Sequence, residues 1–142
     1  MTFNSPRAAG SGHSSPQGLS VGVDLIELDR IRQAVDRHGE RFLTRIYTPR
    51  ELQRYRDRLS ELAARFAAKE AVSKALGVGL NHISPYGIRW HDVEVVPNPL
   101  GKPLVHLSGR ALELAEQQGL HTWAISLSHG RDQAVAFVVA TA

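Results

Sequence analysis

The amino-acid sequence predicts an α+β fold in which helices pack on one face of a small antiparallel sheet. Apolar residues alternate over 19–26, 121–128 and 133–140, which is typical of strands, whereas 29–76 carries helical spacing and helix-end signals. The strands of the second half are joined by short turns, at 97–103 and 129–132, and short turns favour antiparallel pairing.

The first strand, 19–26, contains a carboxylate. Val21, Val23 and Leu25 alternate with Gly22, Asp24 and Ile26, so Asp24 shares a face with a glycine and an isoleucine. An edge strand with one face in solvent would explain this pattern, but glycine and isoleucine make a poor solvent face. Because glycine lets another group approach closely, Asp24 is a candidate functional residue.

Four helices are expected between 29 and 76. Asp29 is predicted to cap a helix ending at Gly39, and a short helix covers 40–47. Thr48-Pro-Arg-Glu51 combines an N-cap residue, proline at N1 and glutamate at N3, a capping-box pattern. Ser60 is predicted to cap a long helix that ends at Leu76 before Gly77.

The long helix places a second carboxylate on an apolar face. At about 100° per residue, Glu70 points to the same side as Ala63 and Ala67, whereas Arg65 and Lys69 are predicted to point outward. A buried carboxylate is costly without a partner, and Lys74 lies one turn further on. The alternative is an ordinary Glu70–Lys74 surface pair.

The second half begins with a glycine-containing loop, 77–87. A strand is expected over 88–96, returning as a hairpin through 104–107. Ser108 is predicted to cap a helix to Gln118, and a last hairpin closes the chain.

The size and composition describe one soluble globular domain of 142 residues, with 42% hydrophobic and 22% charged residues. We expect residues 1–18, rich in Ser, Gly and Pro, to be disordered and 19–142 to form the domain. The absence of cysteine excludes disulfides and thiolate metal sites. No apolar run approaches about 18 residues, and no secretory signal pattern opens the chain, so a cytoplasmic protein without membrane contact is expected.

Positive charge is concentrated between residues 30 and 58. This segment holds nine arginines against four acidic residues, although the whole chain carries only +3. Such a patch favours an anionic partner: nucleic acid, a phosphorylated ligand or an acidic protein. A small RNA-binding module would need exposed aromatics for stacking, for which only Phe42, Tyr47 and Tyr55 qualify. It would also leave Asp24 and Glu70 unexplained, so nucleic acid is not the expected partner.

Asp24, Glu70 and His129 together suggest a metal-dependent enzyme. Two carboxylates without cysteine or clustered histidine suit Mg²⁺ or Mn²⁺, which complete their coordination with water and phosphate oxygens. His129, at a strand end beside a glycine, can contact a phosphate or move a proton, although a turn histidine is often only exposed. The usual glycine-rich nucleotide loops are absent. The residues alone indicate a Mg²⁺-dependent enzyme of phosphate esters.

Four motifs in order resemble a known family. They are Gly22-Val-Asp24-Leu followed by Arg30-Ile31, Arg65-Phe-Ala-Ala-Lys-Glu70-Ala-Val-Ser-Lys74-Ala, Gly101-Lys-Pro103, and Ser126-Leu-Ser-His129. Together they resemble the short bacterial holo-[acyl carrier protein] synthases, which are 4′-phosphopantetheinyl transferases, over about 21–140. The resemblance implies a 4′-phosphopantetheinyl transferase-like α+β fold.

The resemblance also implies a reaction and its site. Mg²⁺ would be held by Asp24, Glu70 and the diphosphate of coenzyme A. The 4′-phosphopantetheine arm would move to a serine hydroxyl of apo acyl carrier protein, releasing adenosine 3′,5′-bisphosphate. Glu70, Lys74 and His129 would be catalytic, and Lys74 and His129 would also bind coenzyme A. The acceptor of the serine proton stays open between a metal-bound water and Glu70.

Partners follow from the same resemblance. Family members of this length are homotrimers with active sites between subunits. Their carrier proteins are acidic, so the basic segment gains a partner, with Arg30 as the main contact and Arg32, Arg37 and Arg41 as helpers. A carrier of polyketide or peptide synthesis, in place of the fatty-acid carrier, is the alternative substrate.

Overall fold

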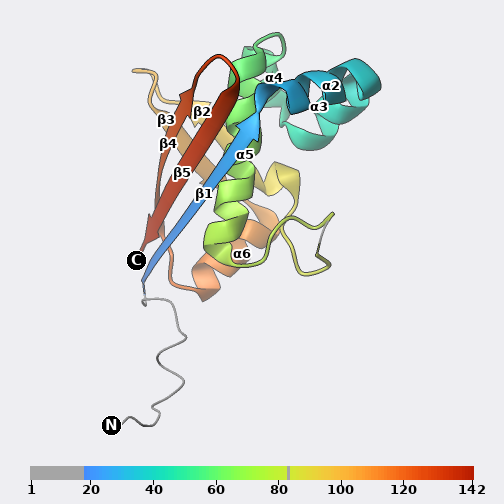
Figure 1. Ribbon diagram of the computed structural model, residues 1–142. Coiled ribbons are helices and arrows are strands. Elements are labelled where there is room, and N and C mark those ends of the chain that lie inside the picture. Colours follow the sequence, from blue (N-terminus) through green and yellow to red (C-terminus); the bar gives the residue numbers. More distant parts are fainter. Residues whose placement is uncertain (1–17, 83) are drawn as a thin grey trace, which may run out of the picture.

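The computed structural model describes residues 18–82 and 84–142 (Figure 1). The predicted disorder of residues 1–18 stays a prediction, because 1–17 lie outside the described residues. The elements in chain order are β1 (Leu19–Glu27), α2 (Leu28–His38), α3 (Glu40–Ile46), α4 (Pro49–Tyr55), α5 (Leu59–Leu76), the 3₁₀ turn η1 (Trp90–Asp92), β2 (Val93–Pro97), β3 (Pro103–Leu107), α6 (Gly109–Gln117), β4 (Thr122–His129) and β5 (Gln133–Thr141).

The strands form two small antiparallel sheets. One has the order β1-β5-β4 and the other pairs β2 with β3, and β3 runs close to β4. Helix α5 crosses one face of the three-stranded sheet and packs on β1 and β5, while α2, α3 and α4 gather near one end of it (Figure 1). The predicted α+β class, with helices on one face of an antiparallel sheet, is confirmed.

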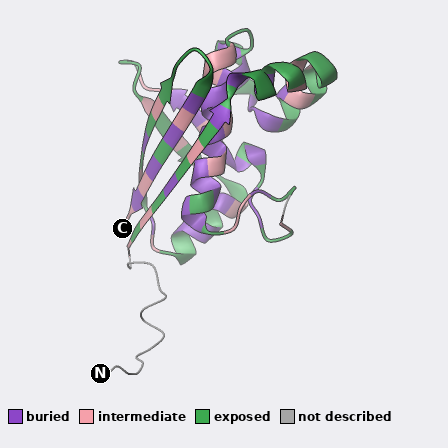
Figure 2. Ribbon diagram, in the orientation of Figure 1, coloured by how far each residue is buried: buried purple, intermediate pink, exposed green. Residues whose placement is uncertain are grey.

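The centre of the molecule is the alanine-rich helix α5, most of which is buried (Figure 2). Small side chains let neighbouring elements come close to a helix on several sides, which a row of large residues would prevent. Its alanines at 63, 64, 67, 68, 71 and 75 are at most 4% exposed. A helix surrounded in this way can position functional groups on more than one side.

Two side chains expected on the outside of α5 are inside. Arg65 is 3% exposed and Lys69 is completely buried, so the prediction that both point outward is wrong. Periodicity identified one packed face, but β2 packs on a second face of α5, and Lys69 reaches η1 beside it. The two cations reach backbone carbonyls of that segment: Arg65 Nε donates to Val95 O at 3.0 Å and Lys69 Nζ donates to Trp90 O at 3.2 Å.

Two predicted helix caps are also wrong. Asp29 lies inside the first turn of α2, where its carboxylate accepts hydrogen bonds from Arg32 and Gln33. Helix α2 begins earlier because Leu28 N donates to Asp132 O in the β4–β5 turn at 2.9 Å. Ser60 likewise lies inside α5, which begins at Leu59.

Other predicted ends are confirmed. Thr48 and Glu51 form the predicted capping box of α4, and Gly77 ends α5 in the left-handed region, with φ 79°. The expected strand over 88–96 begins only at Val93. Asp92 accepts a hydrogen bond from Arg89 N at 3.0 Å, which curls the chain into η1 before β2.

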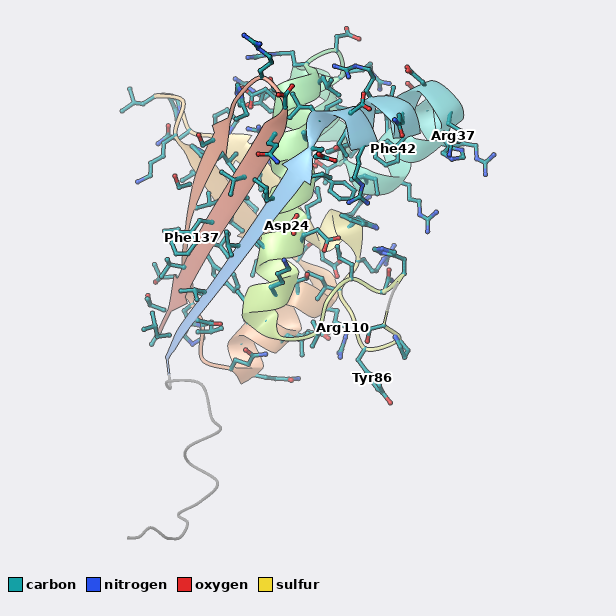
Figure 3. The ribbon with its side chains drawn as sticks, in the orientation of Figure 1. Asp24, Arg37, Phe42, Tyr86, Arg110 and Phe137 are labelled. Atoms are coloured by element: carbon teal, nitrogen blue, oxygen red, sulfur yellow. The ribbon has the colours of Figure 1, made fainter. Side chains whose placement is uncertain are left out.

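No described residue covers the outward face of the three-stranded sheet, which is apolar along β1. Figure 2 shows exposed positions along β1, and Figure 3 shows Phe137 on the side of the sheet away from α5. The large apolar residues of this outer sheet face are Leu19, Val21, Val23, Leu25 and Phe137, between 44% and 57% exposed, and β4 adds the exposed polar residues Thr122, Ser126 and Ser128. Within the described ranges, no helix is both long and apolar enough to cross a membrane.

Candidate active site

Asp24 lies against α5 because of Gly22, two residues earlier on the same face of β1. A Cβ at Gly22 would stand 2.0 Å from the carbonyl oxygen of Ala71, well inside van der Waals contact. The strand backbone therefore touches the helix backbone beside Glu70. This close approach, which only glycine permits, brings the Asp24 carboxylate near enough to the Glu70 carboxylate for their charges to interact.

Glu70 is half-buried, and the pKa of its carboxyl is raised. Burial is the largest cause, because it disfavours the charged form, and the negative charge of Asp24 adds to it. Lys74 and Arg30 act in the opposite direction and lower this pKa. Among the described residues, no hydrogen bond or ion pair is found for the Glu70 carboxylate, whereas its backbone carbonyl accepts from Ser73 Oγ.

Lys74 pairs with the strand and not with Glu70. Its Nζ donates to Asp24 Oδ1 and to Val23 O, each at 3.0 Å. The simple Glu70–Lys74 surface pair is therefore absent within the described chain, and the lysine bridges α5 to β1 instead. The Lys74 side chain is 53% exposed and that of Asp24 only 18%, so the ammonium lies at the mouth of the site.

The two carboxylates fit a hard cation that shares its coordination with a substrate. The described residues contain no group of three or more His, Cys, Asp and Glu side chains placed to hold a metal. Mg²⁺ is commonly held by one or two carboxylates plus water and phosphate oxygens, so Asp24 and Glu70 suffice for it. Asp24 raises the pKa of Glu70 because the two negative charges repel each other. A cation bound between the carboxylates would cancel this repulsion.

His129 is not part of this cluster within one chain. It ends β4, where it pairs with Ala134 of β5. Asp24 of β1 pairs with Ala136 of β5, and Ala136 pairs in turn with Leu127 of β4. His129 is thus two strands away, about 10 Å across the sheet, and two residues further along.

The predicted docking arginines lie on or beside α2. Arg30, Arg32, Arg37 and Arg41 are all exposed, and Figure 3 shows Arg37 pointing away from the body of the molecule. Arg32 is paired with Asp29 at 2.8 Å, whereas no ion pair is found for the other three among the described residues.

The aromatic residues of the basic segment are not placed for nucleic-acid stacking. Tyr47 is completely buried, Tyr55 is 6% exposed, and Phe42 packs against the core. Stacking of bases needs exposed rings, so these residues do not favour the RNA-binding alternative.

Sequence reasoning missed two features near the site. The effect of Arg30 on Glu70 shows that this arginine stands close to the carboxylates as well as on the basic surface. The buried Lys69–Glu51 ion pair, with 2.9 Å between Nζ and Oε1, was also not foreseen. The capping-box pattern could have indicated this pair. Its N3 residue, Glu51, folds back onto the start of the helix, and a carboxylate buried there needs a cation as its partner.

Comparisons with known proteins show the family of this chain. The family model of the 4′-phosphopantetheinyl transferase superfamily matches residues 20–138. The chain is 52% identical over 123 residues to the holo-[acyl-carrier-protein] synthase of Herpetosiphon aurantiacus, covering 85% of this chain and 97% of that protein. The corresponding protein of Desulforudis audaxviator is 48% identical over 125 residues, covering 86% and 92%.

Solved structures give the same result. The crystal structure of Helicobacter pylori holo-[acyl-carrier-protein] synthase in complex with coenzyme A has a TM-score of 0.75 and 32% identity, covering 85% of this chain and 99% of that one. A Bacillus anthracis synthase in complex with CoA (3′,5′-ADP) has a TM-score of 0.68 and 35% identity, covering 86% and 95%. The chain belongs to the 4′-phosphopantetheinyl transferase superfamily, with relatives named holo-[acyl-carrier-protein] synthase.

Proposed function

We propose that this protein transfers the 4′-phosphopantetheine group of coenzyme A to a serine hydroxyl of apo acyl carrier protein. The observation that carries the proposal is the meeting of Asp24, Glu70 and Lys74 between β1 and α5, in a chain about half identical to named holo-[acyl-carrier-protein] synthases. The serine oxygen bonds to the phosphorus that carries pantetheine. The bond from that phosphorus to the bridging oxygen breaks, and adenosine 3′,5′-bisphosphate leaves.

Asp24 and Glu70 are the proposed ligands of Mg²⁺. When bound, the cation neutralises negative charge on the phosphate oxygens during transfer. Asp24 is fixed by the rigid contact of β1 with α5, and Glu70 projects from the buried helix, so neither carboxylate needs a large rearrangement to act.

Lys74 is the proposed contact for the diphosphate. Its ammonium lies at the exposed edge of the carboxylate pair, where an incoming phosphate would meet it first. A lysine on a four-carbon stem can move from Asp24 Oδ1 to a phosphate oxygen and stabilise charge on the leaving group.

The basic surface of α2 and the start of α3 is the proposed docking surface for the acidic carrier. Arg30 is its member nearest the carboxylates, since it acts on Glu70, whereas Arg37 and Arg41 extend the surface outward. Arg32 is weakened as a contact, because Asp29 already pairs with it. Charges at such a rim speed encounter and set orientation more than they drive chemistry.

The outer sheet face supports the proposal of a homotrimer. Apolar patches of this kind on soluble proteins mark contact surfaces, and no Lys, Arg, Asp or Glu interrupts the outward positions of β1 from Leu19 to Leu25. A neighbouring copy seated there would also explain how His129, which lies apart from Asp24 in its own chain, could serve a site formed by two subunits. The cytoplasm is the proposed location.

Mass spectrometry of apo acyl carrier protein tests the reaction. The carrier is incubated with this protein, coenzyme A and Mg²⁺, with an EDTA-treated sample beside it. A mass gain equal to phosphopantetheine that EDTA prevents is the expected result. No gain on fatty-acid, polyketide and peptide-synthase carriers, with a folded protein, would refute the proposal; gain on only one of them identifies the carrier.

A further inference from the structure

A second pair of charged side chains lies on another side of α5, away from the proposed chemistry. Lys69 and Glu51 are each completely buried, and their Nζ and Oε1 atoms are 2.9 Å apart. Burial lowers the pKa of Lys69, an effect that the Glu51 carboxylate opposes. Neither group can reach a substrate, yet Lys69 immediately precedes Glu70 and projects about 100° from it round the helix.

Every polar atom of this pair is used. Lys69 Nζ donates to Trp90 O, Val93 O and the Glu51 carboxylate. Glu51 Oε1 accepts from Thr48 N at 2.9 Å, and Oε2 accepts from Val95 N at 2.8 Å. The pair therefore joins the start of α4, the middle of α5 and the segment η1–β2 in one directional network.

The network takes the place of a neighbouring strand on β2. That strand pairs with β3 on one edge only. On its other edge, Val93 O, Val95 N and Val95 O are bonded by side chains, those of Lys69, Glu51 and Arg65. Because hydrogen bonds are directional, these contacts fix how α5 is turned relative to β2.

The contact of α5 with the three-stranded sheet is also close, and its side-chain hydrogen bonds lie toward the C-terminal end of the helix: Ser20 Oγ donates to Ala75 O at 2.6 Å and Lys74 Nζ donates to Val23 O at 3.0 Å. The bonds made by Arg65 and Lys69 instead hold the middle of α5. The angle at which Glu70 faces Asp24 thus depends on the anchored side as well as on the sheet.

We propose that the Glu51–Lys69 pair is a positioning element that sets the rotation of α5, so that Glu70 faces Asp24 in the geometry that a divalent cation needs. This inference rests on the proposed function of Asp24 and Glu70 as metal ligands. A small rotation of α5 about its axis would move the Glu70 carboxylate away from Asp24. The buried alanines of α5 would still keep the helix folded.

The test measures the affinity for Mn²⁺, a spectroscopic substitute for Mg²⁺, on the full chain with coenzyme A present. The variants are Glu51→Gln, which keeps the side-chain shape, and the double variant Glu51→Gln with Lys69→Met, which leaves no unpaired buried charge. Leu114→Ala on α6 is the control, since it removes buried apolar contact from a helix that makes none of the hydrogen bonds of the Glu51–Lys69 network. Electron paramagnetic resonance counts free Mn²⁺ at a temperature well below each thermal midpoint.

We expect the Kd for Mn²⁺ to rise at least tenfold in both Glu51 variants and to stay unchanged in Leu114→Ala. This difference should hold even if all three variants lower the thermal midpoint by the same amount. In turnover, kcat should fall while the KM for the carrier stays the same. Unchanged Mn²⁺ affinity in the folded variants would overturn the positioning role and leave the pair purely structural. If the parent chain itself bound no Mn²⁺ with coenzyme A, the metal site, and the inference that rests on it, would both be wrong.

Discussion

Two clusters of carboxylate and amine occupy different sides of α5, and they differ in how completely their polar atoms are partnered. On the β2 side, Glu51 and Lys69 are buried, and their hydrogen-bonding groups are satisfied by backbone groups and by each other. On the β1 side, Glu70 is half-buried without a hydrogen bond to its carboxylate among the described residues, and Lys74 is exposed. The same residue types thus stabilise the fold in one place and remain available to ligands in the other.

The largest effect expected on the β1 side is on activity. Asp24→Ala should lower phosphopantetheine transfer by about a thousandfold or more, because losing a metal ligand removes charge stabilisation worth several kcal/mol. The thermal midpoint should change little, since Lys74, the partner of Asp24, is 53% exposed and stays hydrated without it. Transfer rates by mass spectrometry and thermal melts measure both. Asp29→Ala, an exposed acid nearby, is the control, and near-normal turnover of Asp24→Ala would remove Asp24 from the site.

The opposite behaviour is expected on the β2 side. Glu51→Ala leaves the buried Lys69 ammonium without its partner, and breaking a buried pair from one side costs about 3–5 kcal/mol. Urea unfolding of Glu51→Ala beside Glu40→Ala, whose ion pair with Arg56 is exposed on both sides, gives the comparison. Equal losses in the two variants would contradict the difference between a satisfied buried pair and a surface pair.

Gly22→Ala should disturb the contact of β1 with α5, on which the β1 side depends. The added methyl would meet the Ala71 carbonyl, so β1 must move away from α5, at a cost of about 1–3 kcal/mol. Metal affinity should fall as well, because Asp24 moves with the strand. Gly130→Ala, where an added Cβ meets nothing within 4 Å, is the matched control. A Gly22→Ala protein with parental stability and Mn²⁺ affinity would show that the close approach is dispensable.

Arg30→Glu tests the boundary between the site and the docking surface. We expect the KM for the carrier to rise about tenfold, with a smaller rise in the KM for coenzyme A, because charge reversal repels an acidic partner. The control is Arg54→Glu on α4, which changes the net charge of the protein by the same amount. Steady-state kinetics decide the point: equal rises in both KM values would assign Arg30 to phosphate binding instead of docking.

The smallest effect expected concerns pH and the metal-free protein. Burial raises the pKa of the Glu70 carboxyl in the folded chain, and Asp24 raises it further. Below the ordinary glutamate pKa, both folded and unfolded chains keep the proton. As the pH rises through the interval up to the raised value, the unfolded chain releases it first, so the parent loses stability that Glu70→Gln retains.

Urea midpoints in EDTA at pH 4 and pH 8 measure this difference. Glu70→Gln should gain stability relative to the parent at pH 8 only, and Glu113→Gln, an exposed position on α6, should show no such gain. Parallel pH curves for parent and Glu70→Gln would contradict the raised pKa.

Local patterns sufficed for much of the fold. Alternation over 19–26 and 133–140, the Thr48–Glu51 capping box and Gly77 at a helix end each depend on neighbouring residues, and the structure confirms them. The predicted caps at Asp29 and Ser60 were wrong because the start of a helix also depends on residues far along the chain. For α2, the carbonyl of Asp132 accepts a hydrogen bond from Leu28 N. The strand over 88–96 failed because Asp92 bonds back to Arg89.

The sequence by itself determined the α+β class and the family, and it selected Asp24, Glu70 and Lys74 as candidate site residues, because periodicity and motif spacing are properties of neighbours along the chain. Only the tertiary structure decided that Lys74 pairs with Asp24 instead of Glu70, that His129 lies apart from them, and that Arg65 and Lys69 are inside. Helical periodicity describes one packed face, whereas the burial of a second face depends on where β2 returns. That position is set by contacts between residues far apart in the chain, which no local pattern records.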